Sequence, residues 1–402
     1  MKKYRLAIVA SHPIQYQSPL WREIAKHPDI DVVVCYCVDW GVSKPQFHKD
    51  FFGTPYKWDI PLLEGYKYKF LRNYSPKPGP YLGGFINPGI FWELWKNRYD
   101  AVLVMGWMDV TFWFAFLAAK LSGTPVFLRT VNSSYYDTHI KRPLLLLLFK
   151  KLCLKILFHF FVSGFLAIGM WNRNMYLEYG VPPERIFHFP YAVWNEFFFE
   201  ESSKHKSNVK TIRESLGISP NDIVILFAAR FIYRRHPEHA ILAFEKLKDI
   251  PNATLLMVGD GEMMDELKKM SKEKNLKKVR FVGFKNQRAL VEMYTISDIF
   301  VRADEPEEGD WGATVNEAMA CGLPVVCTDT ISSQANLVRR GENGFVYPLG
   351  DLDALAGFLR TMINDRKLLS SMKERSKEVI AKWGYREDVE GMLAVLEYCT
   401  RP

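Results

Sequence analysis

Two arginines are spaced for binding a diphosphate. Arg230 and Arg235 lie in a segment that follows an apolar run and precedes a predicted helix beginning at Pro237. A guanidinium group donates paired hydrogen bonds to phosphate oxygens, and the free N–H groups at a helix start favour an anion. Alone, the pattern would favour a solvated charge run, so its interpretation depends on what lies elsewhere in the chain.

A second segment with suitable chemistry is a glycine-rich, acidic loop that enters a helix. Gly312 and the small residues after it would let a diphosphate approach the backbone closely. Glu317 lies one turn inside the predicted helix, where its carboxylate could accept hydrogen bonds from two ribose hydroxyls. An acid that only stabilises the first helical turn is the alternative. Together with the two arginines, the segment favours a binding site.

The elements that must position these groups alternate between strands and helices. Short apolar runs predict strands at 4–10, 31–37, 100–106, 125–129, 222–229, 253–259, 279–283, 299–301 and 323–327. Helical patterns between them predict an α/β fold with two Rossmann-like, doubly wound sheets. The polar residues 200–209 predict a linker. We therefore expect one domain over 1–199, a second over 210–382, and a final helix within 383–402 that packs back toward the first domain.

The composition limits the classes of binding partner that we expect for this protein. The 402 residues are 48% hydrophobic and 24% charged, and the net charge of +8 is spread without a dense arginine tract. This distribution favours an anionic small molecule or membrane surface over nucleic acid. The six cysteines include no CxxC pair, and the first apolar run is too short for a signal peptide. A reducing, cytoplasmic compartment is the simplest interpretation.

No metal site is predicted. Asp29-Ile30-Asp31 and Asp351-Leu352-Asp353 fit a metal-binding DxD pattern, but the first precedes a strand and the second is expected to cap a helix. None of the nine histidines forms an HExxH motif or an i,i+4 pair with a third ligand nearby.

One segment, residues 141–161, is both basic and strongly apolar. A membrane-spanning helix needs about 20 apolar residues in a row, and Lys150, Lys151 and Lys155 interrupt this one. Two interpretations remain open: a helix lying in a membrane interface beside anionic lipids, or a buried helix whose lysines reach solvent.

The segment 312–326, with the arginine pair and the segment 180–193, resembles the GT4-type retaining glycosyltransferases of the group 1 family. The resemblance covers about residues 165–380 and is looser in the segments 11–16 and 59–66. It implies a GT-B fold, two Rossmann-like domains facing across a cleft. It also implies metal-independent, retaining transfer of a sugar from a nucleotide-sugar donor to a glycan or lipid-linked acceptor, in bacterial surface polysaccharide synthesis. No cofactor is expected.

The resemblance also implies roles for residues. The first domain would face the acceptor and the second would bind the nucleotide sugar. Arg230 and Arg235 would neutralise the departing diphosphate, and Glu317 would hold the ribose. The further expected contacts are backbone N–H groups of Gly312, Ala313, Thr314 and Val315 on the sugar and phosphates, Gly283, Phe284 and Lys285 on the base, and His12 on the acceptor side.

One departure from the family affects the reaction. The family pairs two glutamates with seven residues between them, but Gly309 stands eight positions before Glu317. Glu308 and Asp310 flank this glycine, and either carboxylate could take the role. Two alternatives to a transferase stay open: a nucleotide-sugar epimerase of the same fold, and a non-catalytic nucleotide-sugar-binding homologue. In the first domain, Asp109 and Arg129 follow predicted strands and could contact an acceptor.

Overall fold

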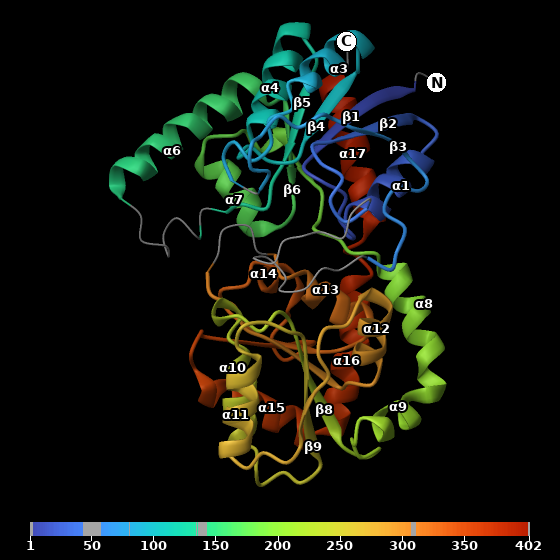
Figure 1. Ribbon diagram of the computed structural model, residues 1–402, viewed down its shortest axis with the longest axis vertical. Coiled ribbons are helices and arrows are strands. Elements are labelled where there is room, and N and C mark those ends of the chain that lie inside the picture. Colours follow the sequence, from blue (N-terminus) through green and yellow to red (C-terminus); the bar gives the residue numbers. More distant parts are fainter. Residues whose placement is uncertain are drawn as a thin grey trace. The chain divides into compact units, whose positions relative to one another are not determined.

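The computed structural model describes residues 3–42, 58–79, 81–133, 135, 143–306 and 311–400. These residues form two compact units (Figure 1). Residues up to 42, from 58 to 192 and from 384 onward make the first unit, and residues 193–383 make the second.

The first unit is built on a sheet in which all strand pairs are parallel, in the order β3-β2-β1-β4-β5-β6-β7. Its strands are β1 (Tyr4–Ala10), β2 (Ile30–Tyr36), β3 (Lys67–Phe70), β4 (Ala101–Val104), β5 (Val126–Arg129), β6 (Gly164–Ala167) and β7 (Ile186–His188). The central strands are continuous apolar runs because helices cover both faces of such a sheet.

The helices of the first unit follow the strands along the chain. They are α1 (Ser18–Lys26), α3 (Gly89–Asn97), α4 (Val110–Ser122), α6 (Leu144–Ile156), the π-helical turn η1 (Leu157–Phe161), α7 (Met170–Glu178), the 3₁₀ turn η2 (Pro183–Arg185) and α17 (Tyr385–Thr400). The last helix, α17, contacts α1, β6 and β7, and the Tyr385 hydroxyl donates a 2.8 Å hydrogen bond to the carbonyl of Tyr16. The end of the chain therefore belongs to the unit in which the chain begins, as the red helix among the blue and green elements of Figure 1 shows.

The second unit repeats the architecture with a parallel sheet in the order β10-β9-β8-β11-β12-β13. Its strands are β8 (Ile223–Ala228), β9 (Ala253–Val258), β10 (Val279–Phe281), β11 (Ile299–Arg302), β12 (Val325–Thr328) and β13 (Gly344–Tyr347). Its helices are α8 (Asn195–His205), η3 (Lys206–Asn208), α9 (Val209–Ser215), η4 (Tyr233–Arg235), α10 (Pro237–Glu245), α11 (Met264–Glu273), α12 (Gln287–Thr295), α13 (Ala313–Ala320), α14 (Gln334–Leu337), α15 (Leu352–Asn364) and α16 (Arg366–Ile380).

The two doubly wound parallel sheets confirm the predicted α/β class. The Asp351 carboxylate accepts a 2.9 Å hydrogen bond from the N–H of Ala354, so this aspartate caps α15 as expected. The stretch 200–209, expected as a linker, is instead helical and lies in the second unit. Glu200, Ser203 and Lys204 lie on the solvent side of α8, whose Phe197 and Phe198 are buried. Composition alone does not distinguish a linker from the exposed face of an amphipathic helix.

The helix α6 tests one of the two interpretations of the basic apolar segment, that of a buried helix, for its described residues. Leu154 is the one buried residue of α6, whereas Leu145 is 84% exposed and Phe149 is 65% exposed. The interpretation as a buried helix is therefore wrong for Leu144–Ile156, because Leu154 is the one leucine of this helix that lies in the core. Among the described residues, no helix is both long and apolar enough to cross a bilayer.

Candidate active site

The centre of each sheet has a point where the strand order reverses. In the second unit, β8 pairs with β9 on one side and with β11 on the other. Ligands of open α/β sheets bind in the crevice beyond the carboxyl ends of the strands at such a point. The segments that follow β8 and β11 carry Arg230, Arg235 and Asp304. The topology thus brings the predicted arginines and the loop before α13 to the same edge of the sheet.

Asp304 holds two arginines at this edge. Arg235 donates from Nη1 to Asp304 Oδ1 at 2.5 Å, and Arg302 donates from Nε to Oδ2 at 2.6 Å. Arg302 also donates from Nη1 to the Thr314 hydroxyl at 3.0 Å, which connects β11 to the first turn of α13. Asp304 is only 2% exposed. Two guanidinium groups thus share one carboxylate, and guanidinium groups suit an anionic ligand.

Arg230 lies in a loop that is fixed to its neighbour. The N–H of Phe231 donates to the carbonyl of Asp260 at 2.8 Å, and the N–H of Met263 donates back to the carbonyl of Phe231 at 3.0 Å. Gly259 permits this approach, since a Cβ there would lie 1.9 Å from the carbonyl oxygen of Ala229. The loops after β8 and β9 are therefore joined through their backbones, and Arg230, in the first of these loops, is half-buried.

The start of α13 is fixed in the same way. Gly312 precedes the helix with φ of +80°, and a Cβ at this position would lie 2.7 Å from Cγ2 of Ile331. The indole N–H of Trp311 donates to Asn316 Oδ1 at 2.8 Å. The N–H of Val315 donates to the carbonyl of Gly312 at 2.8 Å and so closes the first helical turn. Ala313 and Thr314 follow Gly312 and are half-buried.

Glu317 is placed deeper than an ordinary first-turn acid. It is 1% exposed, and its Oε2 accepts a 2.7 Å hydrogen bond from the hydroxyl of Tyr294, a fully buried residue of α12. The tyrosine therefore orients the carboxylate. Contact of Glu317 with a ribose stays a prediction.

The remaining residues predicted to contact the donor follow the edge strand β10 or belong to the acidic segment that precedes α13 in the sequence. Gly283, Phe284 and Lys285 follow β10, and the Phe284 ring is 47% exposed at the carboxyl edge of the sheet. The Gly283 carbonyl accepts from the N–H of Gly259 at 3.0 Å. Glu308 and Asp310 lie outside the described residues. Which of these two replaces the missing glutamate therefore stays open.

In the first unit, the strand order reverses between β1 and β4. His12 follows β1, where its Nδ1 lies 3.0 Å from the hydroxyl of Ser11 and its ring 5.6 Å from that of Trp40. Asp109 follows β4 and is 7% exposed, and its Oδ1 has no hydrogen-bond partner among the described residues. Burial raises the pKa of this carboxyl to about 7.

Arg129 ends β5 and is 4% exposed. Its guanidinium lies 5.6 Å from the ring centre of Phe189 and 5.3 Å from that of Tyr191. Burial raises the pKa of Asp388, on α17, well above its usual range, and the nearby charge of Arg129 opposes this shift. The acceptor roles of His12, Asp109 and Arg129 stay predictions.

Three residues of the site escaped prediction. Arg302 and Asp304 come directly after the apolar residues 299–301, and polar residues at the carboxyl end of a buried strand are a usable signal. Tyr294 carries no such signal, because its link to Glu317 depends on how α12 packs against the rest of the unit.

Comparison with known proteins shows which family this chain resembles. Residues 208–379 match the family model of the glycosyl transferases group 1. The N-acetyl-alpha-D-glucosaminyl L-malate synthase of Bacillus anthracis is 24% identical over 202 residues, which are 50% of this chain and 52% of that protein. The UDP-Gal:alpha-D-GlcNAc-diphosphoundecaprenol alpha-1,3-galactosyltransferase of Escherichia coli is 26% identical over 270 residues, 66% of each chain. The match thus spans about half the length of the first of these relatives.

The structural likeness extends over the whole chain. The crystal structure of the Anabaena protein HepE in complex with UDP superposes with a TM-score of 0.72 at 15% identity, covering 99% of this chain and 100% of that one. The protein therefore has the GT-B fold. Residues 208–379 are similar to the glycosyl transferases group 1 family, in agreement with the resemblance seen in the arginine pair and the segment 312–326.

Proposed function

We propose that this protein is a metal-independent, retaining glycosyltransferase. It transfers a sugar from a nucleotide-sugar donor to a glycan or lipid-linked acceptor during synthesis of a bacterial surface polysaccharide. The observation that carries the proposal is the cluster in which Asp304 holds Arg235 and Arg302 beside the first turn of α13. It holds two guanidinium groups in place at the switch point of a domain that matches the family model.

The proposed role of this cluster is to stabilise the departing diphosphate. In the proposed reaction, the bond between the sugar anomeric carbon and the diphosphate oxygen breaks, and the acceptor oxygen bonds to the same face of that carbon. The acceptor proton passes to the diphosphate. Arg230, Arg235 and Arg302 oppose the negative charge that develops on the leaving group. Since Asp304 already fixes two of the guanidinium groups, little reorganisation is needed when that charge appears.

The names of two relatives support a lipid-linked acceptor. Two relatives are named as enzymes that act on diphospho-undecaprenol-linked sugars, at 26% identity over 270 residues and 28% over 202 residues. A polyprenyl-linked acceptor resides at a membrane surface, so the proposal includes peripheral contact of this protein with the cytoplasmic face of a membrane.

The exposed helix α6 provides a surface for this contact. Leu144, Leu145, Leu148 and Phe149 are each at least 55% exposed, and Lys150, Lys151 and Lys155 lie on the same helix. An apolar helix surface flanked by lysines suits the interface of an anionic bilayer.

Membrane contact is tested with vesicles that contain anionic lipid. Phe149→Glu should weaken co-sedimentation at least tenfold, because it places a charge on the apolar surface. Leu82→Glu is the control, since Leu82 is 70% exposed elsewhere in the same unit. Equal binding by the wild type and both variants would remove α6 from the proposal.

The donor site is tested by thermal stabilisation with UDP-, GDP- and ADP-sugars in EDTA. One nucleotide family should raise the Tm of the wild type, and Arg230→Ala and Glu317→Ala should abolish the shift. Arg360→Ala is the control, because this exposed arginine pairs with Asp249 away from the site. No shift with any nucleotide sugar would contradict the proposal.

Product analysis separates the alternatives. Turnover of the nucleotide sugar without an acceptor would favour an epimerase. Binding without transfer or hydrolysis would favour a non-catalytic homologue.

A further inference from the structure

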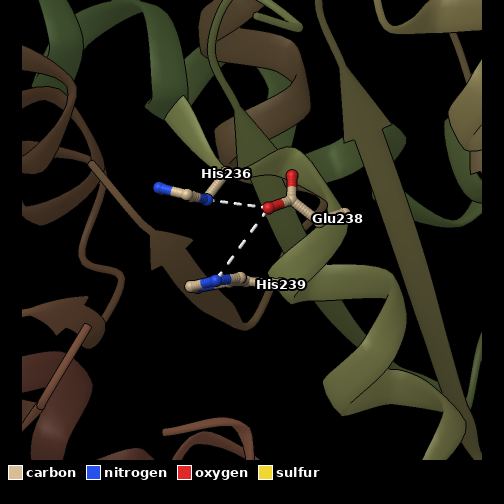
Figure 2. A group of neighbouring side chains, drawn as sticks. All are labelled: His236, Glu238 and His239. Carbon is tan, nitrogen blue, oxygen red and sulfur yellow. Dashed lines mark hydrogen bonds and ion pairs between the residues drawn. The ribbon is translucent and has the colours of Figure 1, made fainter. Parts of the chain in front are cut away.

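Three potential metal-ligand side chains converge where α10 begins. His236 precedes the helix, and Glu238 and His239 lie in its first turn. Figure 2 shows both imidazole rings directed at the same carboxylate. His236 Nδ1 lies 2.7 Å from Glu238 Oε1, and His239 Nε2 lies 4.0 Å from the same oxygen. One ligand atom from each residue can be chosen so that all three lie within 4.8 Å of one another.

The second nitrogen of each histidine also faces a partner. His236 Nε2 lies 3.4 Å from Glu305 Oε1, and His239 Nδ1 lies 3.4 Å from the hydroxyl of Tyr347. In metal sites, the non-ligating ring nitrogen usually donates to such an outer partner, and this fixes the tautomer with its lone pair toward the ion. His239 therefore has the outer hydrogen bond of a ligand, whereas the buried His236 Nε2 faces Glu305 without a hydrogen bond. His236 Nδ1 and His239 Nε2 are directed at Glu238.

The backbone and the carboxylate give two further indications. His236 has φ of +42°, a left-handed conformation that costs a residue with a Cβ about 1 kcal/mol. Strained non-glycine residues of this kind cluster at functional sites. The second oxygen of Glu238, Oε2, is buried without a hydrogen-bond partner among the described residues. A buried carboxylate oxygen of this kind calls for a partner such as an ion.

We propose that His236 Nδ1, Glu238 and His239 Nε2 bind a divalent transition-metal ion, with Zn²⁺ as the best fit. Two imidazoles and one carboxylate are a ligand set for zinc, whereas Ca²⁺ and Mg²⁺ prefer oxygen ligands. Ligand atoms around tetrahedral zinc lie roughly 3.3 Å apart, so small side-chain shifts would complete the site. A fourth position is left for water or another ligand.

The spacing of the three residues matches none of the usual helical metal motifs. They converge because His236 lies before the helix in a left-handed conformation, which turns its ring back over the first turn of α10. The rings of His236 and His239 are nearly parallel, with centroids 4.6 Å apart. Since His236 directly follows Arg235, a bound ion would tie the arginine loop to α10. The ion is proposed to stabilise this loop, while the arginines carry the charge of the transfer reaction.

Metal binding by the full-length protein tests the proposal independently of transferase activity. The protein is treated with a chelator, dialysed and titrated with Co²⁺, followed by Zn²⁺ in competition with a chromogenic chelator. We expect one ion per chain, the visible absorption of four-coordinate cobalt, and a higher Tm with Zn²⁺. Glu238→Gln and His239→Ala should each weaken binding at least tenfold. His205→Ala, a histidine of α8 outside the cluster, should change nothing.

His239→Ala could disturb the packing of α10. The near-isosteric Glu238→Gln variant is therefore the decisive test of the metal site, and its Tm is also measured without metal. A Glu238→Gln protein that melts like the metal-free wild type and has lost the ion supports the site. Equal affinity of the wild type and Glu238→Gln would overturn it. Near-ultraviolet cobalt–thiolate bands would also overturn it, because they would place the ion on a cysteine.

Discussion

The two units share a topology but differ in how four buried acidic residues are satisfied, Asp304 and Glu317 in one and Asp109 and Asp388 in the other; Glu238, part of the proposed metal site, is set apart. In the second unit, Asp304 accepts from two arginines and Glu317 accepts from Tyr294. In the first unit, Asp109 has a buried oxygen and Asp388 two buried oxygens without a hydrogen-bond partner among the described residues. Buried polar groups in native proteins are nearly always paired. The difference indicates that the proposed donor side is organised before a ligand arrives, whereas the proposed acceptor side presents groups that a ligand or water must satisfy.

The largest effect is expected on the reaction. Arg235→Ala should lower kcat/KM at least about 100-fold, because it removes a fixed cation from the developing negative charge. Steady-state kinetics at saturating acceptor measure this effect, with Arg360→Ala as the control. A decrease of less than tenfold would show that Arg235 only serves the fold.

Asp304→Asn should have the largest effect on stability. It leaves Arg235 and Arg302 close together without their shared counter-charge, and breaking a buried ion pair from one side costs about 3 kcal/mol. Urea denaturation measures the free energy of unfolding. Glu342→Gln is the control, because that surface acid pairs with Arg375 and both side chains are exposed. A loss as small as that of the control would mean that the cluster is not held as a unit.

Tyr294→Phe should have a smaller effect. It removes the hydroxyl that donates to the buried Glu317 carboxylate, a hydrogen bond to a charged group that contributes about 2 kcal/mol. Denaturation should show this loss, and donor affinity should fall with it because Glu317 is no longer oriented. Unchanged donor affinity together with reduced stability would separate Glu317 from the donor.

The smallest effect is a change in pH dependence at Asp109. Its pKa rises on folding from 3.8 to about 7, so the native state binds the proton more tightly than the unfolded chain. Stability contributed by the protonated carboxyl is therefore lost as pH rises from about 4 to 7. Asp109→Asn should raise the free energy of unfolding at pH 8 by on the order of 1 kcal/mol, and should change it little at pH 4. The same difference at both pH values would contradict a raised pKa.

Local pattern was enough to predict part of the molecule. Apolar runs ending in Ala228 and Val258 predicted buried parallel strands, because a strand covered on both faces needs continuous hydrophobicity. The cap at Asp351 followed from its position before a helix. These features depend on residues that are neighbours in sequence.

Features that depend on packing were missed. The residues 200–209 look like a linker in composition, but α8 buries Phe197, Phe198 and Ser202 and leaves Glu200 and Lys204 exposed. The link from Tyr294 to Glu317 joins residues of two helices, and the Asp304 cluster joins the loops of two strands. The His236 cluster needs a left-handed residue that nothing in its spacing indicates.

Calorimetric titration with the nucleotide sugar that stabilises the protein tests the difference between the units most directly. Donor affinity is compared for the wild type, Arg235→Ala in the second unit and Asp109→Asn in the first. The account predicts that Arg235→Ala weakens donor binding at least tenfold, while Asp109→Asn binds the donor like the wild type. The opposite pattern, donor binding lost with Asp109→Asn and kept with Arg235→Ala, would contradict the assignment of the donor to the second unit.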